Sequence, residues 1–244
     1  MQKEKSVVLD SCQHTPSQNH LLASLSAAAY SHLLPHLKMA RIRKNEILSE
    51  HGKRSGVIYF PVDCVISIYH TLKNGESTEI AMIGNEGMFD IALFMGGVSM
   101  PYLVVAETSG HAFMLDEHLL KRAFDNDESV RHVLMLYAQA LLTQMAQTIV
   151  CHKDHSLTQQ FCLLLMLLND KALSNDLLLT QESIAHMMGV RREGVTEAAG
   201  KLRDLGFIDY RRGHITVINR AGLENLCCEC YAVVTDEFKR LFGY

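Results

Sequence analysis

The sequence lacks any long hydrophobic run. Its longest apolar stretch is FCLLLMLL at residues 161–168, whereas a membrane-spanning helix needs about 20 apolar residues. The opening segment, MQKEKSVVLDSC, has no apolar core of the kind that a signal peptide carries. We therefore expect a soluble, cytoplasmic protein with no membrane partner.

A paired cysteine framework is missing as well. The seven cysteines are an odd number, and their spacing shows no disulfide pattern. Reduced thiols are typical of cytosolic proteins, because the cytosol keeps cysteines from pairing. This pattern excludes the class of small secreted domains held together by disulfides and agrees with a cytoplasmic location.

The chain also has no overall excess of positive charge. Its formal net charge is −4, from 23 Lys and Arg against 27 Asp and Glu, and a hydrophobic fraction of 48% gives no sign of disorder. Positive charge is instead local: residues 186–220 carry seven Lys or Arg against four acidic residues, a net of +3. A concentrated positive segment attracts phosphates selectively, so this segment is a candidate for nucleic-acid binding.

The pattern along the chain predicts an α+β protein with four segments. Helical spacing broken by Pro35 marks residues 1–39, and short apolar runs separated by turn signals predict a compact antiparallel β-roll over 40–126. The best hairpin signal is KNGE, because Asn74-Gly75 accepts the positive φ values of a tight turn. Residues 127–153 then read as one long helix, and 157–244 as a second domain.

The long helix carries two apolar stripes. Helix-capping residues precede it at 125–128, and no Gly or Pro interrupts 127–152. A helix that is apolar on two sides usually has two neighbours, here its own β-roll and the same helix of a second subunit. The alternative is a helix buried in one core. We expect a homodimer through the first stripe: Leu134, Tyr137, Leu141 and Thr148. The second stripe is Met135, Ala138, Leu142, Met145 and Ile149.

Residues 181–200, QESIAHMMGVRREGVTEAAG, fit the helix-turn-helix pattern. Ala185 is small enough for two helices to cross closely, and Gly189 falls where the chain reverses and a positive φ is needed. Five apolar positions would pack the two helices together: Ile184, Met188, Val190, Val195 and Ala198. An ordinary helical hairpin that binds no DNA is the alternative.

The residues beyond this pattern favour a DNA-binding reading. FIDYRRGHITVI reads as two short strands around the turn RRGH, so Arg211, Arg212 and His214 would lie on a β-wing beside phosphates or a minor groove. Arg191 to Glu193 would enter the major groove first. Arg192 can bind guanine through two hydrogen bonds, and Glu193 can accept one from cytosine. Thr196 and Lys201 lie near the same face. A solvated ion pair is the alternative for Arg192 and Glu193.

In this order of parts the chain resembles the Crp/Fnr family of bacterial transcription regulators, over nearly its whole length. VRREGVTEAAGKL is similar to the family's recognition core. The resemblance implies a β-roll of the cyclic-nucleotide-binding type, a homodimer on a twofold-symmetric double-stranded operator, and RNA polymerase as a partner. It also implies that Arg192 and Glu193 contact bases. A third base-contacting position, often Arg in the family, falls on Glu197, so the operator is expected to differ.

The sensor half departs from family members that bind cyclic AMP. By the resemblance, Leu93-Phe94 matches the family's Leu-Phe anchor, Asp90 falls near its Glu, and Met100-Pro101 stand where Arg-Ser would hold the phosphate. These residues mark the candidate effector pocket: Asp90, Leu93, Phe94 and Met100. Without the arginine, a phosphate lacks its charged, bidentate partner. We therefore expect no tight binding of cyclic AMP in the usual mode.

The cysteines invite other readings, which we weigh against core or free thiols. An iron–sulfur sensor would need clustered N-terminal cysteines, and only Cys12 is there. Cys227, Cys228 and Cys230 cannot all face one metal if they lie on a helix, and a zinc site at Cys151, His152 and His155 would need a fourth ligand from elsewhere. We expect no cofactor.

Two other functions compete with that of a regulator. One is a hydrolase using Cys151 with His152 or His155; those residues are adjacent and no orienting group can be named, so we expect no enzyme. The other is a ligand or redox sensor whose helix-turn-helix contacts protein.

Overall fold

The computed structural model describes residues 14–53, 55–73, 75–97, 101–172 and 174–243. The chain begins there with short helical pieces: η1 (Pro16–Gln18), α1 (His20–Ala23), α2 (Ala27–Leu33) and η2 (Leu34–His36). Pro35 lies in η2, directly after α2 has ended, as its fixed φ and missing N–H require. The buried Asn19 caps α1 and donates hydrogen bonds to the Pro61 carbonyl (2.9 Å) and the Gly87 carbonyl (2.8 Å). These bonds fasten the N-terminal segment to the β-roll.

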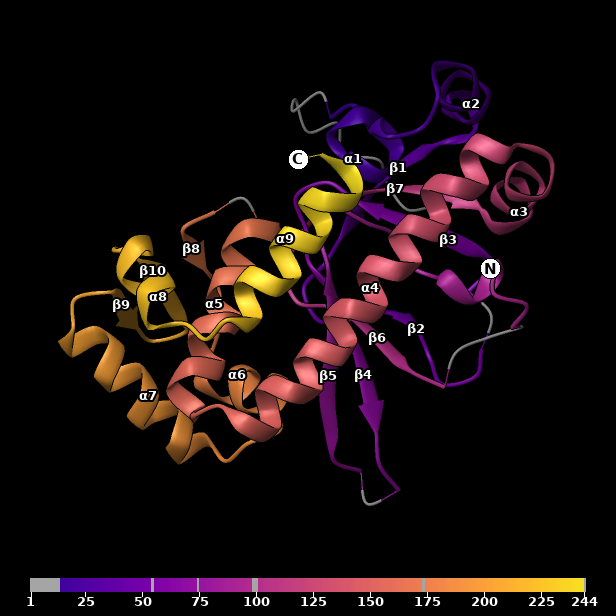
Figure 1. The fold of residues 1–244 in the computed structure, drawn as a ribbon. Helices are drawn as coiled ribbons and strands as arrows, with labels where there is room; N and C mark the ends of the chain where they lie inside the picture. Colours follow the sequence, from indigo (N-terminus) through magenta and orange to yellow (C-terminus); the bar gives the residue numbers. More distant parts are fainter. Residues whose placement is uncertain (1–13, 54, 74, 98–100, 173, 244) are drawn as a thin grey trace.

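The β-roll consists of two antiparallel sheets that face each other across an apolar core (Figure 1). One sheet has the order β1-β7-β3 and the other β2-β6-β4-β5. The strands are β1 (Lys38–Ile42), β2 (Ile47–Ser49), β3 (Val57–Pro61), β4 (Ile66–Thr71), β5 (Ser77–Ile83), β6 (Leu103–Ala106) and β7 (Gly110–Asp116). A short turn, η3 (Ile91–Leu93), lies between β5 and β6. The predicted α+β architecture with an antiparallel β-roll is confirmed.

The β4–β5 hairpin is also confirmed. Its last paired residues are Thr71 and Ser77, and Gly75 has a φ of 88° between them. Asn74, the other half of the predicted turn, lies outside the described residues. The hairpin projects from the roll beside the C-terminal part of the protein (Figure 1).

One helix of this half was not predicted. α3 (Glu117–Asn126) follows β7 without a loop, because the Asp116 carboxylate caps it by accepting a hydrogen bond from the His118 backbone N–H (2.8 Å). No Gly or Pro marks this transition, so the sequence pattern extended the β-roll to residue 126. The roll's last strand in fact ends at Asp116.

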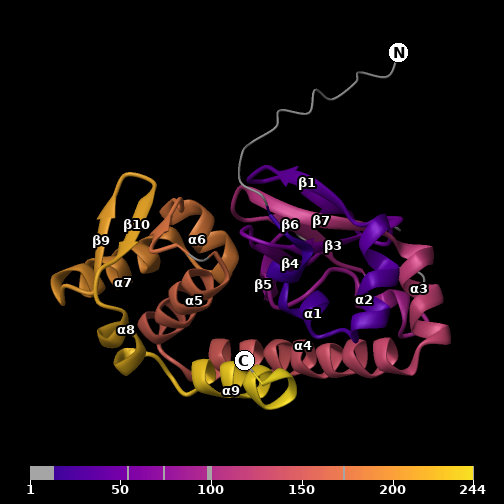
Figure 2. The same cartoon turned by 90° about the horizontal axis from the view of Figure 1, so that it is seen from above.

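The long helix is α4 (Glu128–Asp154). Asp127 caps it by accepting hydrogen bonds from the N–H groups of Ser129 (2.8 Å) and Val130 (3.3 Å), as the capping residues predicted. Among the helices described, α4 alone has the length and apolar composition to cross a membrane. A core helix of a soluble protein has the same properties, and one side of α4 packs on the β-roll (Figure 2).

The C-terminal half is a helical domain with a small sheet. Its elements are α5 (Leu157–Ala172), β8 (Asp176–Leu177), α6 (Gln181–Met188), α7 (Arg192–Asp204), β9 (Ile208–Arg211), β10 (His214–Val217), α8 (Arg220–Leu226) and α9 (Cys230–Phe242). The strands pair in the order β8-β10-β9. α5 is the buried centre, with residues 161–169 all buried. α9 returns to run beside α4 (Figure 2), where Gln139 donates a hydrogen bond to Glu237 (2.9 Å).

Candidate nucleic-acid interface

The turn between α6 and α7 has the geometry that the sequence pattern predicts. Gly189 ends α6 with a φ of 63°, in the left-handed region that favours glycine. The Val190 N–H then donates to the Ala185 carbonyl (3.0 Å) and closes the turn. A Cβ on residue 189 would also lie 2.7 Å from Oγ1 of Thr78. Gly189 is therefore required by both the backbone and the β-roll beneath it.

The two helices pack through the predicted apolar positions. Four residues of α6 and α7 are between 0% and 5% exposed: Ile184, Met188, Val195 and Ala198. Ala185 is buried at the crossing, and Val190 is half-buried. The Thr196 hydroxyl adds a polar link between the helices by donating to Oε1 of Gln181 (2.9 Å). Sequence reasoning missed Gln181 in this role, because nothing in its spacing distinguishes it from a solvated residue.

All the predicted contact residues of α7 are exposed. They are Arg191, Arg192, Glu193, Thr196, Glu197 and Lys201. Arg191 is the N-cap residue, and within the described part of the chain neither its side chain nor that of Arg192 makes a hydrogen bond or an ion pair. Both residues lie at the N-terminus of α7, the positive end of the helix dipole, where an anion is favoured.

The predicted wing is present. β9 and β10 pair through Arg211–His214 and three further residue pairs, with Gly213 at a φ of 79° in the turn. Arg211, Arg212 and His214 are all exposed. Arg211 is not free, however: its Nε donates to the Asp209 carboxylate (2.8 Å). Arg212 at the tip is thus the better placed of the two arginines to contact a phosphate.

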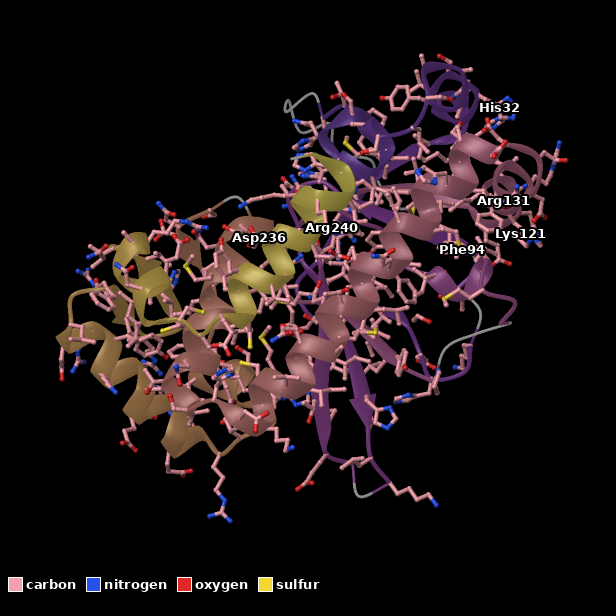
Figure 3. All side chains as sticks on the ribbon, in the orientation of Figure 1. His32, Phe94, Lys121, Arg131, Asp236 and Arg240 are labelled. Atoms are coloured by element: carbon pink, nitrogen blue, oxygen red, sulfur yellow. The ribbon has the colours of Figure 1, made fainter. Side chains whose placement is uncertain are left out.

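The predicted effector residues do not converge on an open cavity. Asp90 caps η3 by accepting a hydrogen bond from the Ala92 N–H (2.8 Å). Leu93 is half-buried, and Phe94 stacks on Phe124 of α3 with 5.2 Å between ring centroids. Lys121 and Arg131 lie near Phe94 on the same side of the molecule (Figure 3) and within 5.8 Å of the Phe124 ring. Met100 lies outside the described residues.

The space beside Asp90 is small. A cavity lined by residues of β4, β5, η3 and α4 has a volume of about 10 Å³, whereas ligand pockets usually have about 300–1,000 Å³. Met88 and Phe89 line it from one side and Leu141 from the other. Among the residues described, the β-roll is therefore closed where an effector was expected.

The predicted dimer stripe is wrong. Leu134, Tyr137 and Leu141 are at most 2% exposed within a single chain, so they cannot also contact a second subunit. Tyr137 donates a hydrogen bond to the Met88 carbonyl (2.7 Å), and Thr148 is half-buried and donates to the Gln144 carbonyl (2.9 Å). This stripe packs on the β-roll. Helical spacing reveals an apolar face but not which neighbour covers it.

The second stripe is only partly uncovered: Ala138 is 2% exposed and Met145 is half-buried against the core, but its other three members are exposed. Met135 is 48% exposed, Leu142 51% and Ile149 67%. Gln139 and Ala146, which are also exposed, lie between them. The steps along this face alternate between four and three residues, which is the spacing of a coiled-coil seam. We call residues 135, 139, 142, 146 and 149 the α4 seam.

The helix-turn-helix rests directly on the β-roll. The His186 ring lies 5.0 Å from the Tyr69 ring, and a hydrogen bond joins its Nε2 to Oγ of Ser77 (3.4 Å). Tyr69 in turn donates to the Glu107 carboxylate (2.6 Å). Burial, and after it the negative charges of Glu79 and Glu107, raise the pKa of the Tyr69 hydroxyl, so it stays a neutral donor.

A buried ion pair makes a second connection between the two halves. Nζ of Lys171, near the end of α5, binds the Glu86 carboxylate in the β5–η3 loop. The side chains are only 7% and 12% exposed, and the same carboxylate accepts a hydrogen bond from the Gly84 N–H (3.1 Å). The orientation of the C-terminal domain is thus defined by polar contacts as well as by α4.

Two family descriptions match the chain in the order of its parts. Residues 39–127 match the cyclic nucleotide-binding domain, and residues 159–226 match the Crp-like helix-turn-helix domain. Among curated proteins, the global nitrogen regulator of Synechococcus elongatus is 25% identical over 194 residues, which cover 71% of this chain and 87% of that protein.

Solved structures share the fold. A putative transcriptional regulator of the crp/fnr family from Eubacterium rectale has a TM-score of 0.67 at 17% identity, covering 86% of this chain and 98% of that one. FixK2 from Bradyrhizobium japonicum also has a TM-score of 0.67, at 18% identity, covering 79% and 98%. At identities of 17% and 18%, these similarities show that the fold is shared and nothing more.

Proposed function

Since this chain belongs to the Crp/Fnr family of transcription regulators, we propose that it binds a twofold-symmetric DNA operator as a homodimer. In this proposal α7 reads bases in the major groove and the β9–β10 wing contacts the backbone. Family membership supports a cytoplasmic location and contact with RNA polymerase. Co-purification of the polymerase with the operator-bound protein tests that contact.

One observation carries the proposal: the exposed, cationic start of α7 behind a glycine turn. Arg191 and Arg192 stand at the N-terminus of a helix whose opposite face is buried against α5 and α6. Because its other face is covered by protein, α7 can enter a major groove only with its N-terminal end and its exposed face. The local net charge of +3 over residues 186–220 favours approach to phosphates although the whole chain is acidic.

The α4 seam supports the homodimer. Three large apolar side chains exposed at coiled-coil spacing require a partner to leave water, and a second copy of α4 has the complementary pattern. Pairing along α4 would relate two α7 helices by a twofold axis. Reading successive major grooves on one side of DNA requires them to lie about 34 Å apart.

A base-reading arginine and a phosphate-contacting arginine should behave differently when removed. Arg192→Ala is expected to lower the affinity for a footprinted operator by about 1–3 kcal/mol and to relax base preference at one position, because it removes a bidentate contact. Arg212→Ala should weaken binding to all duplexes about equally. It should also reduce the salt dependence of the binding constant by the equivalent of about one phosphate contact. Fluorescence anisotropy against an operator series at several salt concentrations measures both. Equal losses on every duplex for Arg192→Ala would exclude direct base reading.

The closed β-roll supports the expectation that cyclic AMP is not bound in the usual mode. Among the described residues, Asp90 is engaged in capping η3 and the adjacent cavity holds only about 10 Å³. Isothermal titration with cyclic AMP and cyclic GMP should therefore give no heat of specific binding. A dissociation constant in the low micromolar range or below would contradict this expectation.

The contacts between α6 and the β-roll suggest how a signal would reach DNA. Gly189 and His186 of the helix-turn-helix touch Thr78, Ser77 and Tyr69. A change in the β4–β5 hairpin would therefore act on α6 directly. An effector would work by favouring the arrangement that matches DNA over the one that does not.

A further inference from the structure

Four potential metal ligands from distant parts of the chain meet beside the end of α4. Cys151 lies in its last turn and His155 directly follows it, while Cys228 precedes α9 and Cys230 begins it. One ligand atom from each residue lies within 4.8 Å of the corresponding atom of every other. We call these four residues the Cys₃His cluster.

Local backbone structure explains how each pair presents its side chains together. Cys151 and His155 are four residues apart, the separation that places side chains on one face of a helix. The other pair does not lie on one helix, contrary to the sequence-based expectation: α8 ends at Leu226, and Cys227 has extended backbone angles (φ −64°, ψ 155°). This break turns Cys228 and Cys230 toward α4, whereas Cys227 is not part of the cluster.

The distances match those of a single tetrahedral ion. Sγ of Cys151 lies 3.6 Å from Sγ of Cys228, and Sγ of Cys230 lies 3.4 Å from Nδ1 of His155. With zinc–sulfur bonds of about 2.3 Å and a zinc–nitrogen bond of about 2.0–2.1 Å, a tetrahedron places two sulfurs about 3.8 Å apart and a sulfur and a nitrogen about 3.6 Å apart. These two distances are within about 0.2 Å of the tetrahedral values, and the other ligand atoms lie within 4.8 Å of one another, so adjustments of about 1 Å or less would bring all four to one ion.

Neighbouring side chains are arranged as outer partners of a metal site. The second nitrogen of His155, Nε2, lies 3.2 Å from the Glu229 carboxylate, which leaves Nδ1 for the metal. Metal-binding histidines usually donate their other N–H to such a partner. Gln147 donates a hydrogen bond to Sγ of Cys230 (3.1 Å) and so stabilises a thiolate there.

Burial and ligand type indicate a structural zinc ion. Cys151 and Cys230 are 0% exposed and Cys228 5%, so the site is closed on the cysteine side, as structural sites are. Three thiolates and an imidazole form a soft, tetrahedral donor set, which suits zinc. A catalytic site would instead keep a ligand position open to substrate.

We propose that Cys151, His155, Cys228 and Cys230 bind one Zn²⁺ ion. The ion joins the end of α4 to the α8–α9 loop. It thereby fastens α9 and the DNA-binding domain to the helix that carries the α4 seam (Figure 2). This inference does not depend on which DNA the protein binds, or on whether it binds any.

The test is the metal content of the purified full-length protein. Mass spectrometry of the metals, under reducing conditions, should find about one zinc per chain. Cys228→Ser, Cys230→Ser and His155→Ala should each lower zinc content at least about tenfold, because each removes a ligand. Two matched controls change neighbouring residues of the same type outside the cluster, Cys227→Ser and His152→Ala, and should keep their zinc.

A measurement on the wild-type protein covers the case in which ligand variants fail to fold. Removing zinc with a chelator and a reductant should lower the melting temperature, and returning Zn²⁺ should restore it. Cobalt(II) in place of zinc should give the intense visible absorption of a tetrahedral thiolate site. Glu229→Gln should keep the fold and weaken zinc affinity about 10–100-fold, as loss of an outer partner does.

Four results would overturn the proposal. The first is a purified protein that contains no zinc and whose melting temperature changes with neither chelator nor added Zn²⁺. The second is iron bound in place of zinc, and the third is a Cys151–Cys228 disulfide in freshly purified protein. The fourth is a loss of zinc in Cys227→Ser as large as that in Cys228→Ser. None of these readouts involves DNA, so the result is independent of the proposed regulatory function.

Discussion

Replacing Leu142 and Ile149 together with glutamate is expected to convert the dimer to monomers and to weaken operator binding by about 10²–10⁴-fold, the range that a second linked binding site contributes. The two side chains are 51% and 67% exposed in the single chain, so the charges cost the folded monomer little. If two α4 helices pair along the α4 seam, the introduced glutamates would place like charges in an apolar contact, which opposes pairing.

Sedimentation velocity and anisotropy on one operator measure the two effects together. Ile47→Glu is the matched control, because Ile47 is also apolar and 55% exposed but lies on β2 of the β-roll. The control should stay dimeric and bind as the wild-type protein does. A double variant that sediments as a dimer with intact operator affinity would show that the α4 seam is not the dimer contact.

The second large effect concerns stability. Lys171→Met or Glu86→Gln should each lower the free energy of unfolding by about 3–5 kcal/mol, because each leaves the other member of a buried ion pair without its partner. Lys171 also lies 5.6 Å from the Phe238 ring of α9, so the damage would extend to the contact between α5 and α9. Thermal and denaturant unfolding followed by circular dichroism give the change.

The double variant separates the pair from its surroundings. Combining Lys171→Met with Glu86→Gln should recover much of the loss, because no uncompensated charge is then buried. Lys239→Met is the control: Lys239 and Asp236 form an exposed pair on α9 (63% and 71% exposed), so the unfolding midpoint should hardly move. If the single variants were as stable as this control, the Lys171–Glu86 contact would contribute nothing to the fold.

Features with a local physical cause were predictable from short stretches of sequence. The start of α4 follows from the Asp127 cap, and the reversal between α6 and α7 follows from the need for a positive φ at Gly189. The wing follows from alternating residues around Gly213. The α3 helix escaped prediction because Asp116, its cap, is also the last residue of β7.

The order of the parts and the residues exposed at the start of α7 were thus contained in local patterns of charge, apolar spacing and turn chemistry. The tertiary structure decided three further matters: that Leu134, Tyr137 and Leu141 face the β-roll, that Met135, Leu142 and Ile149 do not, and that Cys228 and Cys230 meet Cys151 and His155. Helical periodicity shows that a face is apolar but carries no information about its neighbour. Likewise, Cys151 is 77 residues from Cys228 in the sequence, and His155 is 75 residues from Cys230. Only the packing of α9 along α4 brings these side chains together.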